Sequence, residues 1–239
     1  MSIENQKYIP DEIILIIDGQ VKQSLLHDIK KWNEVLPIKI FKLNKNMGLA
    51  YALNYGMRFC NHDWVFRMDI DDVCAKDRFL KQIKIIKANS DIDILGGNIL
   101  CFKSYPNFFS GRTVPSSFNQ IQKFIKFRNP VNHPSVFFNR KRILDIGGYP
   151  NARLGQDYLL WIQAIINGLK IQNTKDILVY MKVDKNSYSR RGLINLKYDT
   201  YPYFLMYSNK IINIFELFIG LSIRLTYCTY STIRSIIKL

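Results

Sequence analysis

Apolar residues along the first hundred positions form short continuous runs that alternate with stretches of helical spacing. The runs are rich in β-branched and aromatic residues and predict strands at residues 13–17, 38–41, 64–68 and 92–96. Apolar positions that recur every three or four residues predict helices at residues 21–35, 49–57 and 78–88. Alternating strands and helices are typical of a doubly wound α/β sheet, which binds ligands beyond the carboxyl ends of its strands.

The pattern is less regular in the second half of the chain. Residues 101–130 contain Pro106, Gly111 and Pro115 and predict no clear element. Further along, the pattern predicts a strand, a turn, a helix and a last strand at residues 135–138, 147–149, 158–167 and 177–181. Gly168 follows the helix directly, as glycine often does at a helix end.

Residues 211–239 are apolar, with isolated charges at Glu216, Arg224, Arg234 and Lys238. The charges leave no run long enough for a membrane-spanning helix. This pattern fits an amphipathic helix pair lying on an anionic membrane, and equally a helix pair packed on the core. We therefore expect an α/β domain over residues 1–205 and a C-terminal amphipathic helical region over residues 206–239.

Composition narrows the classes of function. The chain has 239 residues, of which 48% are hydrophobic, so it can bury a sizeable core. Its formal charge of +15 favours an anionic partner such as nucleic acid, a membrane or a diphosphate, although solubility or a lysine-rich composition would also explain it. No nucleic-acid-binding module is recognisable. The four cysteines have no metal-ligand spacing, and the first residues do not resemble a secretion signal, so we expect a cytoplasmic protein.

The segment Asp69-Ile70-Asp71-Asp72 directly follows a predicted buried strand. Asp69 and Asp71 would project to the same side of an extended segment, and neighbouring carboxylates repel each other unless a cation lies between them. Mg²⁺ and Mn²⁺ prefer such oxygen ligands and often bridge them to substrate phosphates. The segment therefore predicts a metal site. The alternative is a solvated acidic turn that caps the next helix, and a glycoside hydrolase would also use two carboxylates.

Three other features have both a structural and a functional interpretation. Asp157 begins a predicted helix, where it serves as an N-cap or as a general base. His133 is a structural histidine or contacts a ligand or acceptor. Arg190 and Arg191 stand beside Gly192 in a solvated basic loop or bind the oxygens of a diphosphate or an acidic acceptor.

Taken in order, these segments resemble glycosyltransferase family 2, the inverting enzymes of GT-A fold. Within it they look like the group of amylovoran, capsule and O-antigen biosynthesis transferases. The matching motifs are PDEIILIIDG (10–19), NMGLAYALNYG (46–56), RMDIDD (67–72), RNPVNH (128–133), GGY (147–149), QDYLLW (156–161) and SRRG (189–192). The resemblance covers about residues 2–200 and implies a mixed GT-A sheet flanked by helices.

The resemblance also implies roles for individual residues. Asp18 would hold the nucleotide base, Asp69 the ribose or base, and Asp71 would coordinate Mg²⁺ or Mn²⁺ with support from Asp72. Asp157 would be the catalytic base. Other donor-side positions are Asn46, Gly48, Asn54, Arg190 and Arg191, and candidate acceptor-side or metal positions are His133, Gln156 and Trp161.

Two departures from the family pattern stand out. Family members begin with a strand and a helix before the segment that starts at Pro10, whereas residues 2–6 resemble the end of that helix, so we expect the first strand to be absent. Gln156 also replaces the glutamate that normally precedes the base, although Asp157 itself is present.

The function implied is inverting transfer of a sugar from a nucleoside diphosphate, most simply UDP, to a glycan on a polyprenyl diphosphate. The product would enter cell-surface polysaccharide, and the enzyme would work peripherally on the inner face of the plasma membrane. The alternative is a truncated, catalytically inactive relative that binds nucleotide or partners only.

Overall fold

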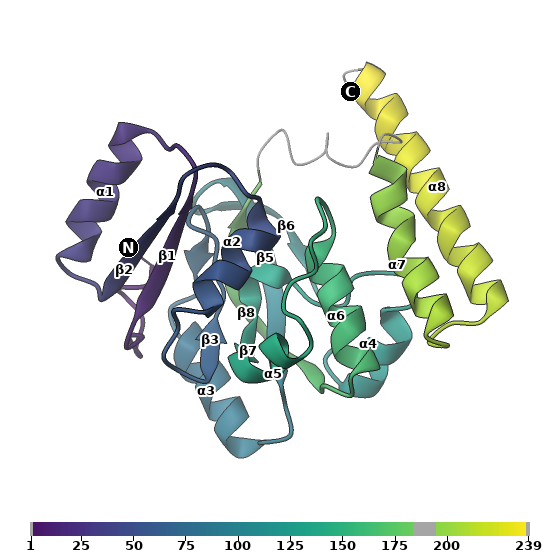
Figure 1. Cartoon of the computed structure of the whole chain (residues 1–239), viewed down its shortest axis with the longest axis horizontal. Coiled ribbons are helices and arrows are strands. Elements are labelled where there is room, and N and C mark those ends of the chain that lie inside the picture. The colour runs from purple at the N-terminus through teal and green to yellow at the C-terminus, as the bar shows by residue number, and fades with distance from the viewer. Residues whose placement is uncertain (1, 184–194, 238–239) are drawn as a thin grey trace.

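The computed structural model describes residues 2–183 and 195–237 of the chain (Figure 1). The helices are α1 (Gln23–Asn33), α2 (Leu49–Met57), α3 (Arg78–Ala88), α4 (Phe118–Phe124), α5 (Arg140–Asp145), α6 (Gln156–Ile166), α7 (Leu196–Ser208) and α8 (Ile214–Ile237). The strands are β1 (Ile13–Asp18), β2 (Ile38–Leu43), β3 (Trp64–Phe66), β4 (Val73–Cys74), β5 (Ile94–Ser104), β6 (Asn107–Arg112), β7 (Phe137–Asn139) and β8 (Ile171–Lys182). No helix within these ranges combines the length and apolarity needed to cross a membrane.

The strands form two sheets. β1 and β2 pair in parallel as a two-stranded sheet, from Ile13 opposite Ile38 to Asp18 opposite Leu43. The larger sheet has the order β3-β7-β5-β8-β4, with β6 paired to β5. Its only parallel pair among the described strands is β5 with β8, and the others are antiparallel, so the sheet is mixed as the resemblance implied.

Helix α6 forms the centre of the hydrophobic core. Its sequence is apolar on every face, and the side chains from Tyr158 to Ile162 are all buried. Trp161 is fully buried and belongs to the main core cluster, together with residues of α2, β5 and β7. Because the middle of α6 is buried in the core, the position of its half-buried first turn is fixed by that packing.

Most of the expected elements in the first half of the chain are confirmed, including α3 over residues 78–88. The less regular segment between residues 101 and 130 contains elements that its pattern did not predict. There β5 continues to Ser104, turns back as β6, and is followed by α4. Helix α4 begins with a capping box in which Ser117 accepts a hydrogen bond from the backbone N–H of Gln120, a signal that the sequence carries.

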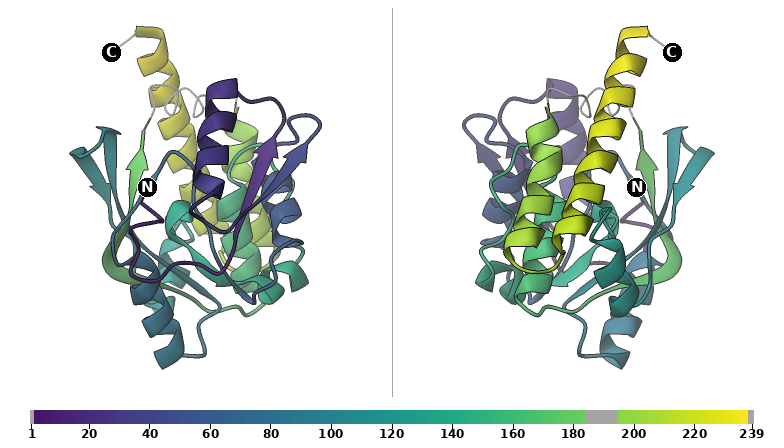
Figure 2. Two further views of the ribbon diagram at one scale, coloured as in Figure 1. Left: turned by 90° about the vertical axis from the view of Figure 1, so that its left-hand side faces the viewer. Right: turned by 90° about the vertical axis from the view of Figure 1, so that its right-hand side faces the viewer.

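The C-terminal helices differ from the expected arrangement. The pair expected within residues 211–239 is formed by α7 and α8, and only α8 lies in that range. Helix α7 also runs across the expected domain boundary between residues 205 and 206. Tyr203 of α7 and Leu217 of α8 belong to the main core cluster, so the pair is anchored to the rest of the protein. Figures 1 and 2 show the two helices as an outer layer at one end of the molecule.

Candidate functional site

The three carboxylates that follow β3 differ in their surroundings. Asp69 forms a two-pronged ion pair with Arg67, with N–O distances of 2.6 and 2.5 Å. Asp71 is exposed, and none of the described residues forms an ion pair with it. Asp72 is buried, and its Oδ1 accepts a hydrogen bond of 2.8 Å from the backbone N–H of Lys182 at the end of β8. Asp71 is therefore exposed to solvent, between Asp69, which Arg67 holds, and Asp72, which the backbone of Lys182 holds.

Asp72 carries an electrostatic penalty in this structure. Its Oδ2 is buried and has no hydrogen-bond partner among the described residues. Burial has the largest effect on Asp72 and raises its pKa, as do the charges of Asp69 and Asp71, whereas the bond from Lys182 and the charge of Arg67 lower it; the net result is a pKa of about 7. A cation beside this turn would relieve both the burial and the repulsion. The turn therefore fits a divalent metal, although the described side chains do not by themselves form a cluster of three or more potential ligands.

Arg78 supports the carboxylate turn from behind. This arginine is fully buried on α3, and its Nη2 donates to the carbonyls of Arg67 at 2.9 Å and Val136 at 3.3 Å. Its Nε donates to Gln82, whose amide in turn donates to the carbonyls of Leu95 and Ser135. Sequence analysis did not identify Arg78, because a lone arginine in a helix is normally a surface residue.

Asp157 lies in the first turn of α6 and is half-buried. Its Oδ2 accepts a hydrogen bond of 2.7 Å from the side-chain amide of Asn129. The other end of that amide, Oδ1 of Asn129, accepts from the backbone N–H of Val131 at 3.2 Å, which fixes the direction in which the amide points. The backbone carbonyl of Asn129 accepts from Arg112 at 2.5 Å. Asp157 is thus oriented by a residue that is itself held in place.

His133 and Tyr149 form a buried pair. Nε2 of His133 lies 2.9 Å from the hydroxyl of Tyr149. Burial lowers the pKa of His133 well below its usual value, and the charge of Arg67 acts in the same direction. Burial also raises the pKa of Tyr149, while the charge of Arg67 lowers it and those of Asp157 and Asp69 raise it. The charges of Asp157 and Asp69 therefore both affect the pKa of Tyr149, although these residues are far apart in the sequence.

The other expected donor residues surround helix α2. The two carboxylate oxygens of Asp18 accept hydrogen bonds from the backbone N–H groups of Met47 at 2.6 Å and Gly48 at 2.9 Å. Gly48 has a φ of 88° directly before α2. The side-chain amide of Asn54 both donates to and accepts from the backbone of Tyr149, at 2.8 Å each. Helix α2 therefore links the end of β1 to the His133–Tyr149 pair.

The remaining expected residues differ in their exposure. Gln156 begins α6 and is half-buried. The indole of Trp161 is fully buried and its Nε1 has no partner among the described residues, so in this structure it packs in the core. Asn46 donates only a long 3.5 Å bond to the carbonyl of Asp18. Arg190 and Arg191 lie outside the described residues.

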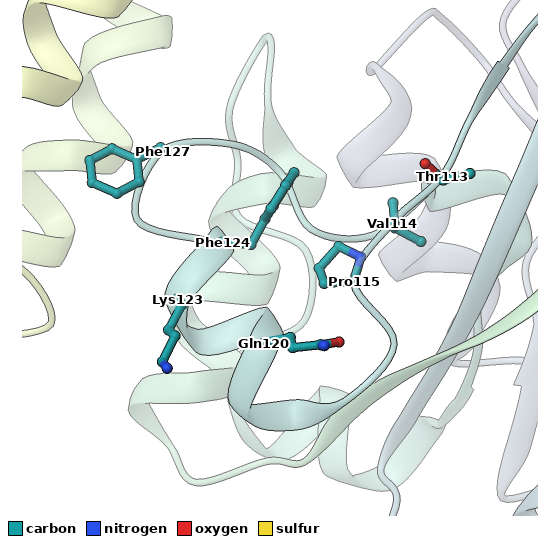
Figure 3. Close-up of a pocket in the computed structure, with 7 residues that line it drawn as sticks. All are labelled: Thr113, Val114, Pro115, Gln120, Lys123, Phe124 and Phe127. Carbon is teal, nitrogen blue, oxygen red and sulfur yellow. The ribbon is translucent and has the colours of Figure 1, made fainter.

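An open pocket of about 640 Å³ lies between residues 113–115 and α4 (Figure 3). Phe124, Phe127 and Lys123 contribute to its lining. None of the residues expected from the sequence to bind donor, metal or acceptor lines this pocket.

Comparison with known proteins identifies the family to which this chain belongs. Residues 1–147 match the model of "Glycosyl transferase family 2". The chain belongs to glycosyltransferase family 2. An uncharacterised glycosyltransferase of Haemophilus influenzae is 41% identical over 186 residues, which are 77% of this chain and 69% of the relative. The UDP-Gal:alpha-D-GlcNAc-diphosphoundecaprenol beta-1,3-galactosyltransferase of Escherichia coli is 40% identical over 192 residues, covering 80% of this chain and 70% of that enzyme. This chain is therefore a glycosyltransferase.

A third relative and two solved structures extend the comparison. The amylovoran biosynthesis glycosyltransferase AmsE of Erwinia amylovora is 33% identical over 190 residues, which are 80% of this chain and 71% of the relative. S. aureus TarS 1-349 in complex with UDP-GlcNAc has a TM-score of 0.69 at 17% identity and covers 94% of this chain and 66% of its own. The mannosyltransferase PcManGT of Pyrobaculum calidifontis, in complex with GDP-Man and Mn²⁺, has a TM-score of 0.63 at 16% identity, covering 92% and 62%. At these identities the structures establish the GT-A fold of this glycosyltransferase.

Proposed function

We propose that this glycosyltransferase moves a sugar from a nucleoside diphosphate, most simply UDP, to a glycan on a polyprenyl diphosphate, with inversion at the anomeric carbon. The observation that carries the proposal is the half-buried carboxylate of Asp157 in the first turn of α6, oriented by a hydrogen bond of 2.7 Å from Asn129. An oriented general base is what a single displacement at a sugar carbon requires.

The donor would bind over the ends of β1 and β3. Asp18 would bind the nucleotide base. A carboxylate has about four acceptor positions, and the N–H groups of Met47 and Gly48 use only some of them. Asp69, held by Arg67, would meet the ribose or base. Arg190 and Arg191 would meet the diphosphate. Asn46, Gly48 and Asn54 would shape the donor side from the start of α2.

Asp71 would hold Mg²⁺ or Mn²⁺ because it is the exposed carboxylate of the turn, and Asp72 would support it from the buried side. The unpartnered Oδ2 of Asp72 and its raised pKa are the observations that favour a cation here. The relative PcManGT, whose structure contains Mn²⁺ and GDP-Man, has the same fold. A bound divalent ion would neutralise charge that develops on the leaving diphosphate.

Asp157 would accept the proton of the acceptor hydroxyl. The hydroxyl oxygen then forms a bond to the anomeric carbon while the bond from that carbon to the diphosphate oxygen breaks, and the nucleoside diphosphate leaves. Asn129 donates to Oδ2 of Asp157 and so leaves Oδ1 for the incoming hydroxyl. His133 and Gln156 would serve the acceptor side, whereas the buried Trp161 would act only through packing.

The acceptor class rests on a relative. The Escherichia coli enzyme is named for a diphosphoundecaprenol-linked acceptor and the Erwinia amylovora enzyme for amylovoran biosynthesis. We propose a comparable lipid-linked acceptor for this chain, in O-antigen, capsule or exopolysaccharide biosynthesis. Such an acceptor would place the enzyme peripherally on the anionic cytoplasmic face of the plasma membrane.

The proposal is tested by incubating the whole chain with UDP-sugars, Mn²⁺ or Mg²⁺ and a synthetic polyprenyl diphosphate glycan. We expect sugar transfer by the wild type, none by Asp157→Asn with donor binding intact, and no metal-dependent transfer by Asp71→Ala. Asp145→Asn is the matched control, because this aspartate is exposed at the end of α5. A folded wild type that binds UDP but transfers no sugar would favour the inactive nucleotide-binding alternative.

A further inference from the structure

The outer layer formed by α7 and α8 exposes many large apolar side chains. On α8 the exposed fraction reaches 75% for Phe215 and 62% for Phe218. We call the helix-pair face the set of exposed apolar residues Tyr201, Phe204, Tyr207, Phe215, Phe218, Ile219, Ile223, Leu225, Tyr230 and Ile233. Soluble proteins rarely expose so many contiguous apolar residues unless the surface binds something.

The charged residues of α8 between Ile214 and Ile233 do not reach this face. Between Ile214 and Ile233 the helix contains only two charged residues, Glu216 and Arg224. Glu216 pairs with Lys126 at 2.7 Å. Arg224 donates to the hydroxyl of Tyr203 at 3.1 Å and to the carbonyl of Phe127 at 3.4 Å. Both charges are thus turned toward the protein, and about five turns of helix present an uncharged surface to the outside.

Two threonine hydroxyls on α8 are bonded within the helix. Thr226 donates to the carbonyl of Ser222, and Thr229 donates to the carbonyl of Leu225, each at 2.9 Å. A largely apolar surface without charged side chains between Ile214 and Ile233 offers few directional contacts to a protein partner. Hydrocarbon chains need none, so the surface suits lipid.

We propose that the helix-pair face is the membrane-contact surface of this enzyme, with α8 lying along an anionic bilayer and its outward side chains among the acyl chains. Phenylalanine and aliphatic side chains are favourable at the boundary between headgroups and acyl chains, and tyrosine rings are favourable at the level of the headgroups. The exposed Lys197 and Lys210 lie at the ends of α7, and the chain carries a net charge of +15, which complements anionic headgroups. This assignment rests on the proposed function, because a polyprenyl-linked acceptor resides in the membrane.

The test is co-sedimentation of the whole chain with vesicles of phosphatidylglycerol and phosphatidylcholine. We expect the double variant Phe215→Ser, Phe218→Ser to bind at least about tenfold more weakly than the wild type, because two exposed rings are lost from the contact. The double variant Phe108→Ser, Phe109→Ser removes two exposed rings of β6 instead and is expected to bind as the wild type does. Unchanged vesicle binding by the α8 variant would overturn the assignment.

Two further measurements distinguish membrane contact from the alternative roles of this face. If the α8 variant converts a wild-type dimer to a monomer while vesicle binding is unchanged, the face binds a second copy of the chain and the proposal is wrong. We expect the α8 variant to transfer sugar normally to a short-chain, water-soluble acceptor and slowly to a long-chain acceptor in vesicles. Equal rates on both acceptors would contradict the proposal. Vesicle binding by a wild type that transfers no sugar would refute the proposed function alone.

Discussion

Replacing Asn129 by alanine removes one specific bond to the proposed base. The amide of Asn129 lies 2.7 Å from Oδ2 of Asp157 and has its other end fixed by Val131. A hydrogen bond to a charged group contributes about 1.5–3 kcal/mol, which corresponds to a fall in kcat of about 10- to 100-fold if the carboxylate loses its orientation. We expect the donor KM to stay unchanged, because Asn129 contacts no proposed donor-binding residue.

The assay is a double-mutant cycle with Asp157→Glu, which keeps a carboxylate but displaces it from Asn129, using steady-state transfer to a soluble acceptor. If Asn129 acts through its bond to Asp157, its removal has little further effect once that bond is already lost. Asn167→Ala is the matched control, because Asn167 caps the opposite end of α6 and its exposed side-chain amide donates to the carbonyl of Gln163 within the same helix. The reasoning fails if kcat of Asn129→Ala stays within about twofold of the wild type, or if the loss is the same in both backgrounds.

Three other expectations concern stability. His133 is buried with a pKa held well below its usual value, so the unfolded chain binds more protons than the folded chain once the pH falls below about 6.5. Thermal melts should therefore show the free energy of unfolding decreasing there by up to about 1.4 kcal/mol per pH unit, and His133→Gln should reduce this decrease. Gly48→Ala should lower the free energy of unfolding by about 1 kcal/mol in urea titrations, since nothing crowds a Cβ there and only the φ of 88° opposes it; an unchanged midpoint would contradict this. Arg78→Ala should cost more than about 3 kcal/mol, because the carbonyls of Arg67 and Val136 lose their buried donor, and a loss below about 1 kcal/mol would show that water replaces it.

The part of the fold that depends on local pattern could be predicted from the sequence. The apolar run at Ile13–Asp18 forms β1, and the periodic segment Arg78–Ala88 forms α3 with the expected bounds. Helix α4 was missed because its seven residues are too short to show a period, although its capping box is visible. Helix α5, with six residues, was missed for the same reason.

What could not be predicted depends on contacts between distant residues. Nothing near Asn129 in the sequence indicates that it bonds to Asp157, and nothing near Arg78 indicates full burial. The apolar pattern of residues 211–239 was correctly associated with helix, but the side toward which Arg224 points is decided by Tyr203 and Phe127. The assignments of Asp18, Asp69 and Asp71 to donor and metal stay predictions.

The central claim is inverting transfer with Asp157 as the base. It is tested most directly by the anomeric configuration of the product formed from a UDP-α-sugar and a polyprenyl diphosphate glycan, read from the proton coupling in the NMR spectrum. We expect a β-linked product from the wild type and no product from Asp157→Asn. An α-linked product, or undiminished transfer by Asp157→Asn, would contradict the account.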